Sequence, residues 1–353
     1  LEALRSVRCT SHVNADAYEY VPLTMAKRGL WCCRIDSEAT MQFARDNKLP
    51  FLHLLEYRQH IPDVMSLQFV RKLYISTASL DRQLAITALP SQLEIFECRG
   101  YMFEAMPALP DTFRRLVWTD FSPLFFDDGV VRHFTGPLPT SLTHLWCRLP
   151  RLELPKLLPP TLVQLDVDYC HLMNGGTLPA LPATLTDLSC KYCHLTQLPE
   201  LPPSLLHLDF SGNDRITARL GTFPARLKRL ECARTELAHL PTLPLTLEHL
   251  NCSSNRLQAL PDPLPPNLEY LDCYGNDLHI LPALVPQNRT DMHGGGAQQD
   301  RLDSRPAYLP RLKFLNCSKN KLTALPTLPA TLVTLSCNSN SLESLPTMPE
   351  TLT

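Results

Sequence analysis

Leucine and other apolar residues return at fixed spacings along most of the chain. The clearest copy of the pattern is LEHLNCSSNRLQALP at 247–261, and nearly the same letters return at 268–282, 312–326 and 332–346. The unit is L-x-x-L-x-C-x-x-N-x-L-x-x-L-P, counted below from its first leucine as position one. It recurs about every 20 to 23 residues, and a fixed period of this size is the signature of a stacked solenoid.

The repeat extends over almost the whole chain. Regular units begin at Leu93, Leu142, Leu162, Leu185, Leu205, Leu227, Leu247, Leu268, Leu312 and Leu332. Weaker copies lie at 4–9, 30–35, 52–57, 70–75 and 113–118. We therefore predict one continuous domain, with degenerate repeats over 1–88 and a regular solenoid over 89–353. The first residue is Leu1 and Pro349 has just opened another unit, so we expect both ends to be truncated.

The alternation inside each unit predicts a short strand. At 187–191, Asp-Leu-Ser-Cys-Lys, leucine and cysteine fall on one face and polar residues on the other. Because the chain always returns the same way, successive strands should stack in parallel, about 4.8 Å apart. The Leu-Pro steps belong to the return side, since proline cannot donate to a ladder. We expect that convex side to be extended or polyproline-like, with few helices.

Three local features add to this picture. Asparagine at position nine can hydrogen-bond the backbone of the neighbouring turn. Residues 37–46 carry a capping residue, Ser37, and predict a short helix, either a helical return or a docking element. The polar stretch 287–305 interrupts one link and predicts a flexible insert. The insert contains an N-glycosylation sequon at Asn288, which would be modified only if the chain passed through a secretory pathway.

Charge and hydropathy narrow the classes of partner. The formal net charge is −2, so bulk electrostatics give no argument for nucleic acid or a membrane surface. No stretch approaches about 18 consecutive apolar residues, the length that a membrane span needs. We expect no nucleic-acid partner, no membrane span and a monomer.

The 13 cysteines of the chain mostly follow the repeat. Position six carries Cys9, Cys98, Cys147, Cys190, Cys232, Cys252, Cys273, Cys317 and Cys337. There a free cysteine acts as a small core hydrophobe. Cys170 and Cys193 take position nine. A column of free thiols favours a reducing compartment, cytoplasmic in the cell of origin or in a host, though the sequence does not fix localisation.

Two metal hypotheses arise from the cysteines. C-x-x-C-H at 190–194 is a haem attachment motif in isolation, but the repeat phase places Cys190 in the core. Cys170-His171 and Cys193-His194 share a phase and could approach a tetrahedral zinc site; two coincidental outward histidines are the alternative. We predict no metal and no cofactor.

Links of the form L-P-x-L-P, such as 198–202 and 325–329, identify a known class of repeat. They resemble the short leucine-rich repeats of bacterial type III secreted effectors of the YopM and IpaH kind. Effectors of the IpaH kind carry a separate ubiquitin-ligase domain with a Cys-x-Asp motif. No cysteine here is followed two residues later by aspartate. With no phosphate-binding loop either, we predict that this chain is not an enzyme.

The strand face that the leucines do not use should point into the concavity of the solenoid. Positions three, five and seven form a polar and aromatic column there. An ordinary solvated sheet face is one interpretation, and a partner-binding surface is the other. The predicted contact residues are Arg99, Arg115, Trp146, Arg148, Asp166, Asp168, Asp187, Asp209, Glu231, Tyr270, Asp272 and Tyr274.

The sequence thus predicts a leucine-rich repeat solenoid that binds a protein partner through its concave face without catalysis. One alternative is the substrate-recognition part of a larger secreted effector or ubiquitin ligase. A second alternative is an extracellular surface protein. The identity of the partner cannot be read from these residues.

Overall fold

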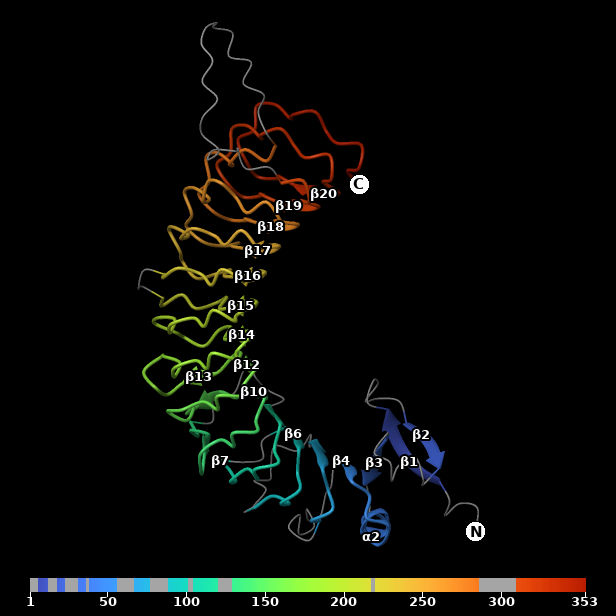
Figure 1. Ribbon diagram of the computed structural model, residues 1–353. Coiled ribbons are helices and arrows are strands. Elements are labelled where there is room, and N and C mark those ends of the chain that lie inside the picture. Colours follow the sequence, from blue (N-terminus) through green and yellow to red (C-terminus); the bar gives the residue numbers. More distant parts are fainter. Residues whose placement is uncertain are drawn as a thin grey trace, which may run out of the picture. The chain divides into compact units, whose positions relative to one another are not determined.

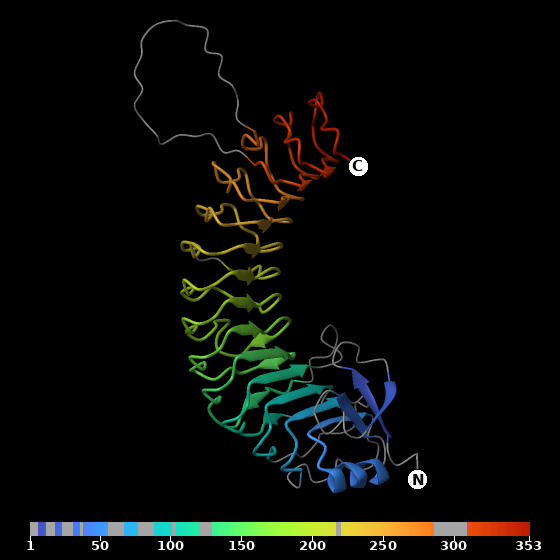
Figure 2. The ribbon, with the colours of Figure 1, turned by 45° about the vertical axis from the view of Figure 1, so that its right-hand side comes forward.

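The protein is described by a computed structural model covering residues 6–11, 18–22, 31–35, 38–55, 67–76, 88–100, 104–119, 129–216, 220–285 and 309–353. The chain forms two compact units, Leu1–Leu185 and Thr186–Thr353, and each is a stack of strands joined by long returns (Figure 1, Figure 2). The insert predicted at 287–305 lies outside the described residues. A helix, α2, spans Glu38–Asn47.

The first unit holds the longer strands. Its main sheet has the order β2 (Tyr18–Pro22), β1 (Ser6–Ser11), β3 (Trp31–Ile35), β4 (Phe51–Leu55), β5 (Lys72–Ser76), β6 (Ile95–Arg99), β8 (Arg115–Thr119), β10 (His144–Arg148) and β12 (Gln164–Asp166). Two small parallel pairs accompany it: β7 (Ala105–Met106) with β9 (His133–Phe134), and β11 (Arg151–Leu152) with β13 (His171–Leu172).

From β3 onward the strands of this unit are parallel, as predicted. The register pairs position four of each repeat with position four of the next repeat, for example Leu73 with Phe96 and Phe96 with Leu116. The copy at 30–35 belongs to the ladder in phase, but the predicted phase of the copy at 52–57 is wrong. Leu52 pairs with Cys33 and with Leu73, both at position four, so this repeat begins at Leu49 and not at Leu52.

The start of the chain departs from the predicted parallel ladder. β1 runs antiparallel to both β2 and β3, and Cys9 pairs with Cys33 in the second of these pairs. The expectation that the copy at 4–9 is an ordinary repeat is therefore wrong. Only residues 12–17 separate β1 from β2, whereas a parallel connection needs about a dozen residues or more. The short connection leaves the antiparallel hairpin as the available pairing.

The second unit is more regular. Its strands are β14 (Asp187–Ser189), β15 (His207–Asp209), β16 (Arg229–Glu231), β17 (His249–Asn251), β18 (Tyr270–Asp272), β19 (Phe314–Asn316) and β20 (Thr334–Ser336). All neighbours are parallel and keep the leucine of position four in register, from Leu188 to Leu335. The described residues of this unit contain no helix, because the proline-rich returns are extended (Figure 2).

Leucine and cysteine fill the core of both units. In the repeat that begins at Leu247, the side chains of Leu247, Leu250 and Leu257 are buried, and so is that of Cys252. The position-six thiols from Cys98 to Cys337 are free, and burial raises the pKa of Cys252 and Cys273, and that of Cys317 to about 12. Such thiols stay protonated and act as apolar packing groups, as the phase of the repeat predicted.

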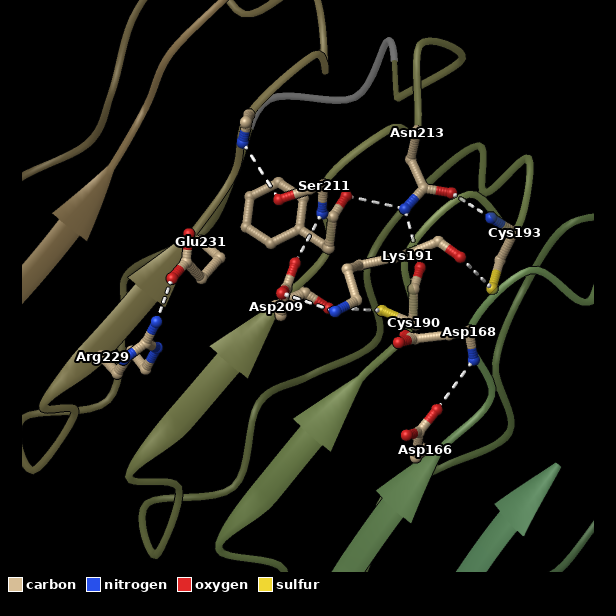
Figure 3. Close-up of polar contacts among 12 residues, drawn as sticks. Asp166, Asp168, Cys190, Lys191, Cys193, Asp209, Ser211, Asn213, Arg229 and Glu231 are labelled. Atoms are coloured by element: carbon tan, nitrogen blue, oxygen red, sulfur yellow. Dashed lines mark hydrogen bonds and ion pairs between the residues drawn. The ribbon is translucent and has the colours of Figure 1, made fainter. Parts of the chain in front are cut away.

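Asparagine at position nine joins consecutive turns. The Asn213 side-chain oxygen accepts from the backbone N–H groups of Cys193 and Leu195, both at 3.0 Å (Figure 3). Its amide group donates to the carbonyls of Cys190 at 2.8 Å and Phe210 at 2.7 Å. Equivalent bonds to the two flanking position-six carbonyls recur at Asn255, Asn276, Asn320 and Asn340. The predicted role of this asparagine is confirmed.

Cysteine substitutes for that asparagine in the first unit. The Cys170 sulfur accepts from the Leu149 N–H at 3.3 Å and donates to the Cys147 carbonyl at 3.1 Å. The two bonds reproduce half of what an asparagine makes, because a thiol offers one donor and a weak acceptor. The position-nine cysteine therefore has a structural role.

The return side is held by a second set of side-chain bonds. In the turn before most strands, a proline carbonyl accepts from the position-one N–H, as in Leu247 to Pro244 at 3.1 Å; before β19 the acceptor is the Leu309 carbonyl. The preceding Thr246 hydroxyl contacts the carbonyls of Ala225 and Leu227, both at 2.8 Å. Where the sequence reads P-x-T-L, the threonine thus ties its turn to the previous one.

Candidate functional site

The candidate site is the strand face, defined here as the side chains at positions three, five and seven of the repeats. Position four is buried in β15, β16 and β18, and its two neighbours are exposed or half-buried on the opposite side. This is the period-two alternation expected of a sheet with one face in the core. The two units present separate parts of the strand face.

In the first unit, Arg148 is bound by two carboxylates. Its guanidinium lies 2.8 Å from the Asp166 carboxylate and 3.5 Å from that of Asp168. The hydrogen bond to Asp166 is the main cause that raises the pKa of Arg148. Asp168 is only 1% exposed, so it acts from within the turn and is not available as a surface contact.

A second cluster of the first unit joins three predicted residues. The Glu97 carboxylate lies 3.4 Å from Arg99 and 3.5 Å from Arg115. The Arg115 guanidinium also lies 4.4 Å from the centre of the Trp146 ring, within the range of a cation–π contact. The ring and the guanidinium are therefore held in a fixed arrangement on the strand face.

The second unit carries a row of ion pairs. Lys191 lies 3.4 Å from Asp209, and Arg229 lies 2.7 Å from Glu231 (Figure 3). Two histidines that the sequence analysis did not single out complete the row. His207 lies 2.6 Å from Asp187 and His249 lies 2.8 Å from Glu231. Both histidines occupy position three of their repeats. That position, which lies on the strand face, is the sequence signal that could have identified them as site residues.

Next to this row, three rings are stacked on consecutive strands. His249 and Tyr270 have centroids 4.1 Å apart with planes at 7°, and Tyr270 and Phe314 have centroids 4.3 Å apart with planes at 4°. All three occupy position three, and the parallel register places them one above another. Tyr274 stands apart from this stack, with the Lys319 ammonium 5.2 Å from its ring centre.

Several predicted acidic residues also have a structural role. Asp209 accepts the N–H of Ser211 at 3.1 Å (Figure 3), and Asp272 accepts that of Tyr274 at 3.0 Å. Asp166 does the same for Asp168 at 3.1 Å. Uncharged Asn251 and Asn316 make the equivalent bond at position five. This turn needs an acceptor and not a charge, so the acidic column is partly a consequence of the fold.

The carboxylates differ in how their charge is stabilised. Burial raises the pKa of Asp209 above its ordinary value, and burial also raises that of Asp272. Burial acts in the same direction on Glu231, but the hydrogen bond and charge of His249, with help from Arg229, bring its pKa below the ordinary value. Burial and the charge of Asp272 raise the pKa of the Tyr270 hydroxyl.

The zinc hypothesis finds no ligand set. The Cys170 sulfur donates to Cys147 and the Cys193 sulfur donates to the Lys191 carbonyl at 3.3 Å. Within the described ranges, no group of three or more His, Cys, Asp or Glu residues is placed to hold a metal ion. Over the same ranges, no helix is long and apolar enough to cross a bilayer.

The parallel ladder, the one-sided leucine core and the asparagine column define a leucine-rich repeat protein. Its fold is similar to that of YopM from Yersinia pestis, a leucine-rich effector protein, with a TM-score of 0.55 and 24% identity over 88% of each chain. YopM from Yersinia enterocolitica WA-314 aligns with a TM-score of 0.47 and 28% identity, covering 86% of this chain and 75% of that one. A leucine-rich repeat protein of Leptospira interrogans gives a TM-score of 0.42 and 18% identity, over 88% and 95% of the two chains. No protein-family model and no curated protein matches the chain.

Proposed function

We propose that this chain is a non-catalytic recognition module that binds a protein partner through its strand face. Stacked repeats of this kind offer an extended surface and are protein-interaction modules. The observation that carries the proposal is the stack of His249, Tyr270 and Phe314 on the face that the core does not use.

Stacked rings suit recognition for two physical reasons. Aromatic side chains dominate the binding energy of protein interfaces. Rings already ordered by their neighbours lose little further conformational freedom when a partner binds. Tyr270 is held on both sides, by His249 and by Phe314, so it is the most preorganised of the three. We assign it the largest share of the binding energy.

The remaining predicted residues form the periphery of the proposed surface. Trp146 with Arg115 gives the first unit an aromatic anchor of its own. The paired charges Arg99, Arg148, Asp166, Asp187, Asp209 and Glu231 serve orientation more than affinity. Asp168 is removed from the contact set because its side chain is buried.

The test is affinity capture from lysate with quantitative mass spectrometry. Wild type is compared with a Tyr270→Ala, Phe314→Ala variant, after circular dichroism has shown that both are folded. The matched control is Leu245→Ala, Ile280→Ala, which removes apolar side chains that are 68% and 70% exposed on the returns. A partner kept by wild type and by the control but lost by the ring variant supports the proposal. Equal capture by all three contradicts it.

A role as the recognition part of a larger secreted effector remains the alternative. It concerns sequence beyond these residues, and the same surface would serve it. A downstream domain with a Cys-x-Asp motif in the full reading frame would favour that alternative.

A further inference from the structure

Asp272 differs from the other carboxylates on the strand face. Each of the others has a basic side chain close by: Glu97 has Arg99 and Arg115, Asp166 and Asp168 share Arg148, Asp187 has His207, Asp209 has Lys191, and Glu231 has Arg229 and His249. Among the residues whose positions are described, none places a basic group within ion-pair distance of Asp272.

The Asp272 carboxylate is held in place and half-buried. One oxygen accepts the Tyr274 N–H at 3.0 Å, and the Asn316 side chain donates a further hydrogen bond. These neutral donors orient the group, and the charge of His249, which itself lies 2.8 Å from Glu231, makes a smaller contribution to lowering its pKa. A partly desolvated carboxylate gains more from a cation than a fully solvated one does, because the surrounding dielectric is lower.

The surroundings of Asp272 suit the stem of a long basic side chain. Tyr270 precedes it by two residues on the same strand, at position three, and Phe314 stacks on that ring. Tyr274 follows it at position seven, and the Lys319 ammonium already lies 5.2 Å from the centre of that ring. Lysine and arginine place their methylene groups on apolar surface and keep the charged end polar. A carboxylate flanked by three rings matches both parts of such a side chain.

We infer that Asp272, with the rings of Tyr270, Tyr274 and Phe314, forms a site for a lysine or arginine side chain of the protein partner. The inference rests on the proposed function and adds the chemistry of the group that is recognised. The partner cation would form the close ion pair that no described residue forms with Asp272.

Substitution by asparagine removes the charge and keeps the turn. Asn251 and Asn316, at the same position of neighbouring units, accept the position-seven N–H as Asp272 does. Asp272→Asn is therefore compatible with the fold. Glu269→Gln is the matched control, because it removes a carboxylate of the same repeat that lies outside the strand face, at position two, and that pairs with Lys313 at 2.8 Å.

The probe is a library of immobilised dodecapeptides in which the central residue is fixed and the others are randomised. The fixed residue is arginine, lysine, or one of their neutral analogues, citrulline and norleucine. The purified 353-residue chain is applied as wild type, Asp272→Asn, Glu269→Gln and Tyr270→Ala. Wild type should retain the cationic sets about three- to tenfold better than the neutral sets, the range for a partly exposed charge pair. The preference should persist in Glu269→Gln and disappear in Asp272→Asn.

The outcomes test the cation site and the proposed function of the strand face separately. A wild-type chain without a preference for cations, or a preference that survives in Asp272→Asn, overturns the cation site. If Tyr270→Ala still lowers retention of every peptide set in that case, the strand face remains the binding surface. If Tyr270→Ala retains all sets as well as wild type does, the proposed function fails together with the site.

Discussion

The two units build the same ladder by different means. In the first unit, β6, β8 and β10 are five residues long, while every strand of the second unit has three. The short strands occur where a position-nine side chain bonds the neighbouring turns, as Asn255 does. Within the first compact unit, β12 is also three residues long, and the repeat that contains β12 has the Cys170 bonds. Backbone bonds between neighbouring repeats continue beyond these short strands, as from the Cys252 N–H to the Asp272 carbonyl at 2.8 Å, and the side-chain bonds in the turn add to them.

The largest effect should come from the core of the second unit. Leu250→Ala should lower the free energy of unfolding by about 2–5 kcal/mol, because the deleted side chain is fully buried and leaves a cavity. Urea denaturation measures the loss, and limited proteolysis should place the new cleavage near that turn. Leu245→Ala, at an exposed leucine, should change stability by less than about 0.5 kcal/mol. Equal losses in the two variants would contradict the assignment of the core.

The asparagine column is expected to give the next largest effect. Asn255→Ala should cost about 3 kcal/mol, since it leaves the buried N–H groups of Thr235 and Leu237 and two cysteine carbonyls without partners. Asn255→Cys should cost less, because Cys170 shows that a thiol makes two of these bonds. Thermal unfolding of both variants decides the order. An Asn255→Cys variant as unstable as Asn255→Ala would show that a cysteine at position nine does not replace the hydrogen bonds of asparagine in the second unit.

The position-five turn should contribute less. Asn251→Ala removes the acceptor for the Ser253 N–H and should cost about 1 kcal/mol. The control is Asn338→Ala, at an exposed asparagine whose side chain makes no hydrogen bond within the described part of the chain. Chemical denaturation of the pair should show a loss in the first variant only. A similar loss in both would mean that the turn does not depend on the acceptor.

Neighbouring carboxylates should respond to pH with opposite signs. The folded-state pKa of Asp209 is raised from its ordinary value of 3.8, so its ionisation disfavours the fold, and Asp209→Asn should gain stability relative to wild type as pH rises above that value. The pKa of Glu231 is lowered from 4.5, so its contribution is present above that pH and is lost below it. Glu231→Gln should therefore be less stable than wild type at neutral pH and converge with it in acid. Denaturation between pH 3 and 7 tests both, and shifts of the same sign would refute the assignment.

The exposed ion pairs on the flanks should matter least. Lys228 lies 3.0 Å from Glu248, and both side chains are well exposed. Lys228→Ala should change the free energy of unfolding by no more than about 0.5 kcal/mol, and less at high salt. A loss comparable to that of Asn251→Ala would show that surface charge, and not turn bonding, organises the second unit.

The repeat phase made most of the fold predictable. Leu188 and its counterparts at position four, the cysteines at position six and the asparagines at position nine all lie where the pattern placed them. The antiparallel start was not predicted, because apolar spacing around Cys9 does not encode strand direction. The ring stack was only partly visible: Tyr270 was predicted, but its contact with His249 depends on what occupies the same position one unit away.

The candidate site needed the structure for a similar reason. The sequence treated Asp166, Asp209 and Asp272 as one acidic column, but their environments differ. Arg148 binds the first, Lys191 approaches the second, and no described residue places a basic group within ion-pair distance of the third. A single-sequence pattern shows that these side chains share a face. Which of them keeps an unpaired charge depends on side-chain geometry between neighbouring units.

Site-specific photocrosslinking tests the central claim most directly. A benzoylphenylalanine is introduced at the position of Phe314 on the strand face, and in a second sample at the position of Ile280, which is 70% exposed on a return. Both chains are irradiated in lysate and the adducts are identified by mass spectrometry. The account predicts a defined protein adduct from position 314 that is absent from position 280. The same adducts from both positions, or a defined adduct from position 280 alone, would contradict recognition through the strand face.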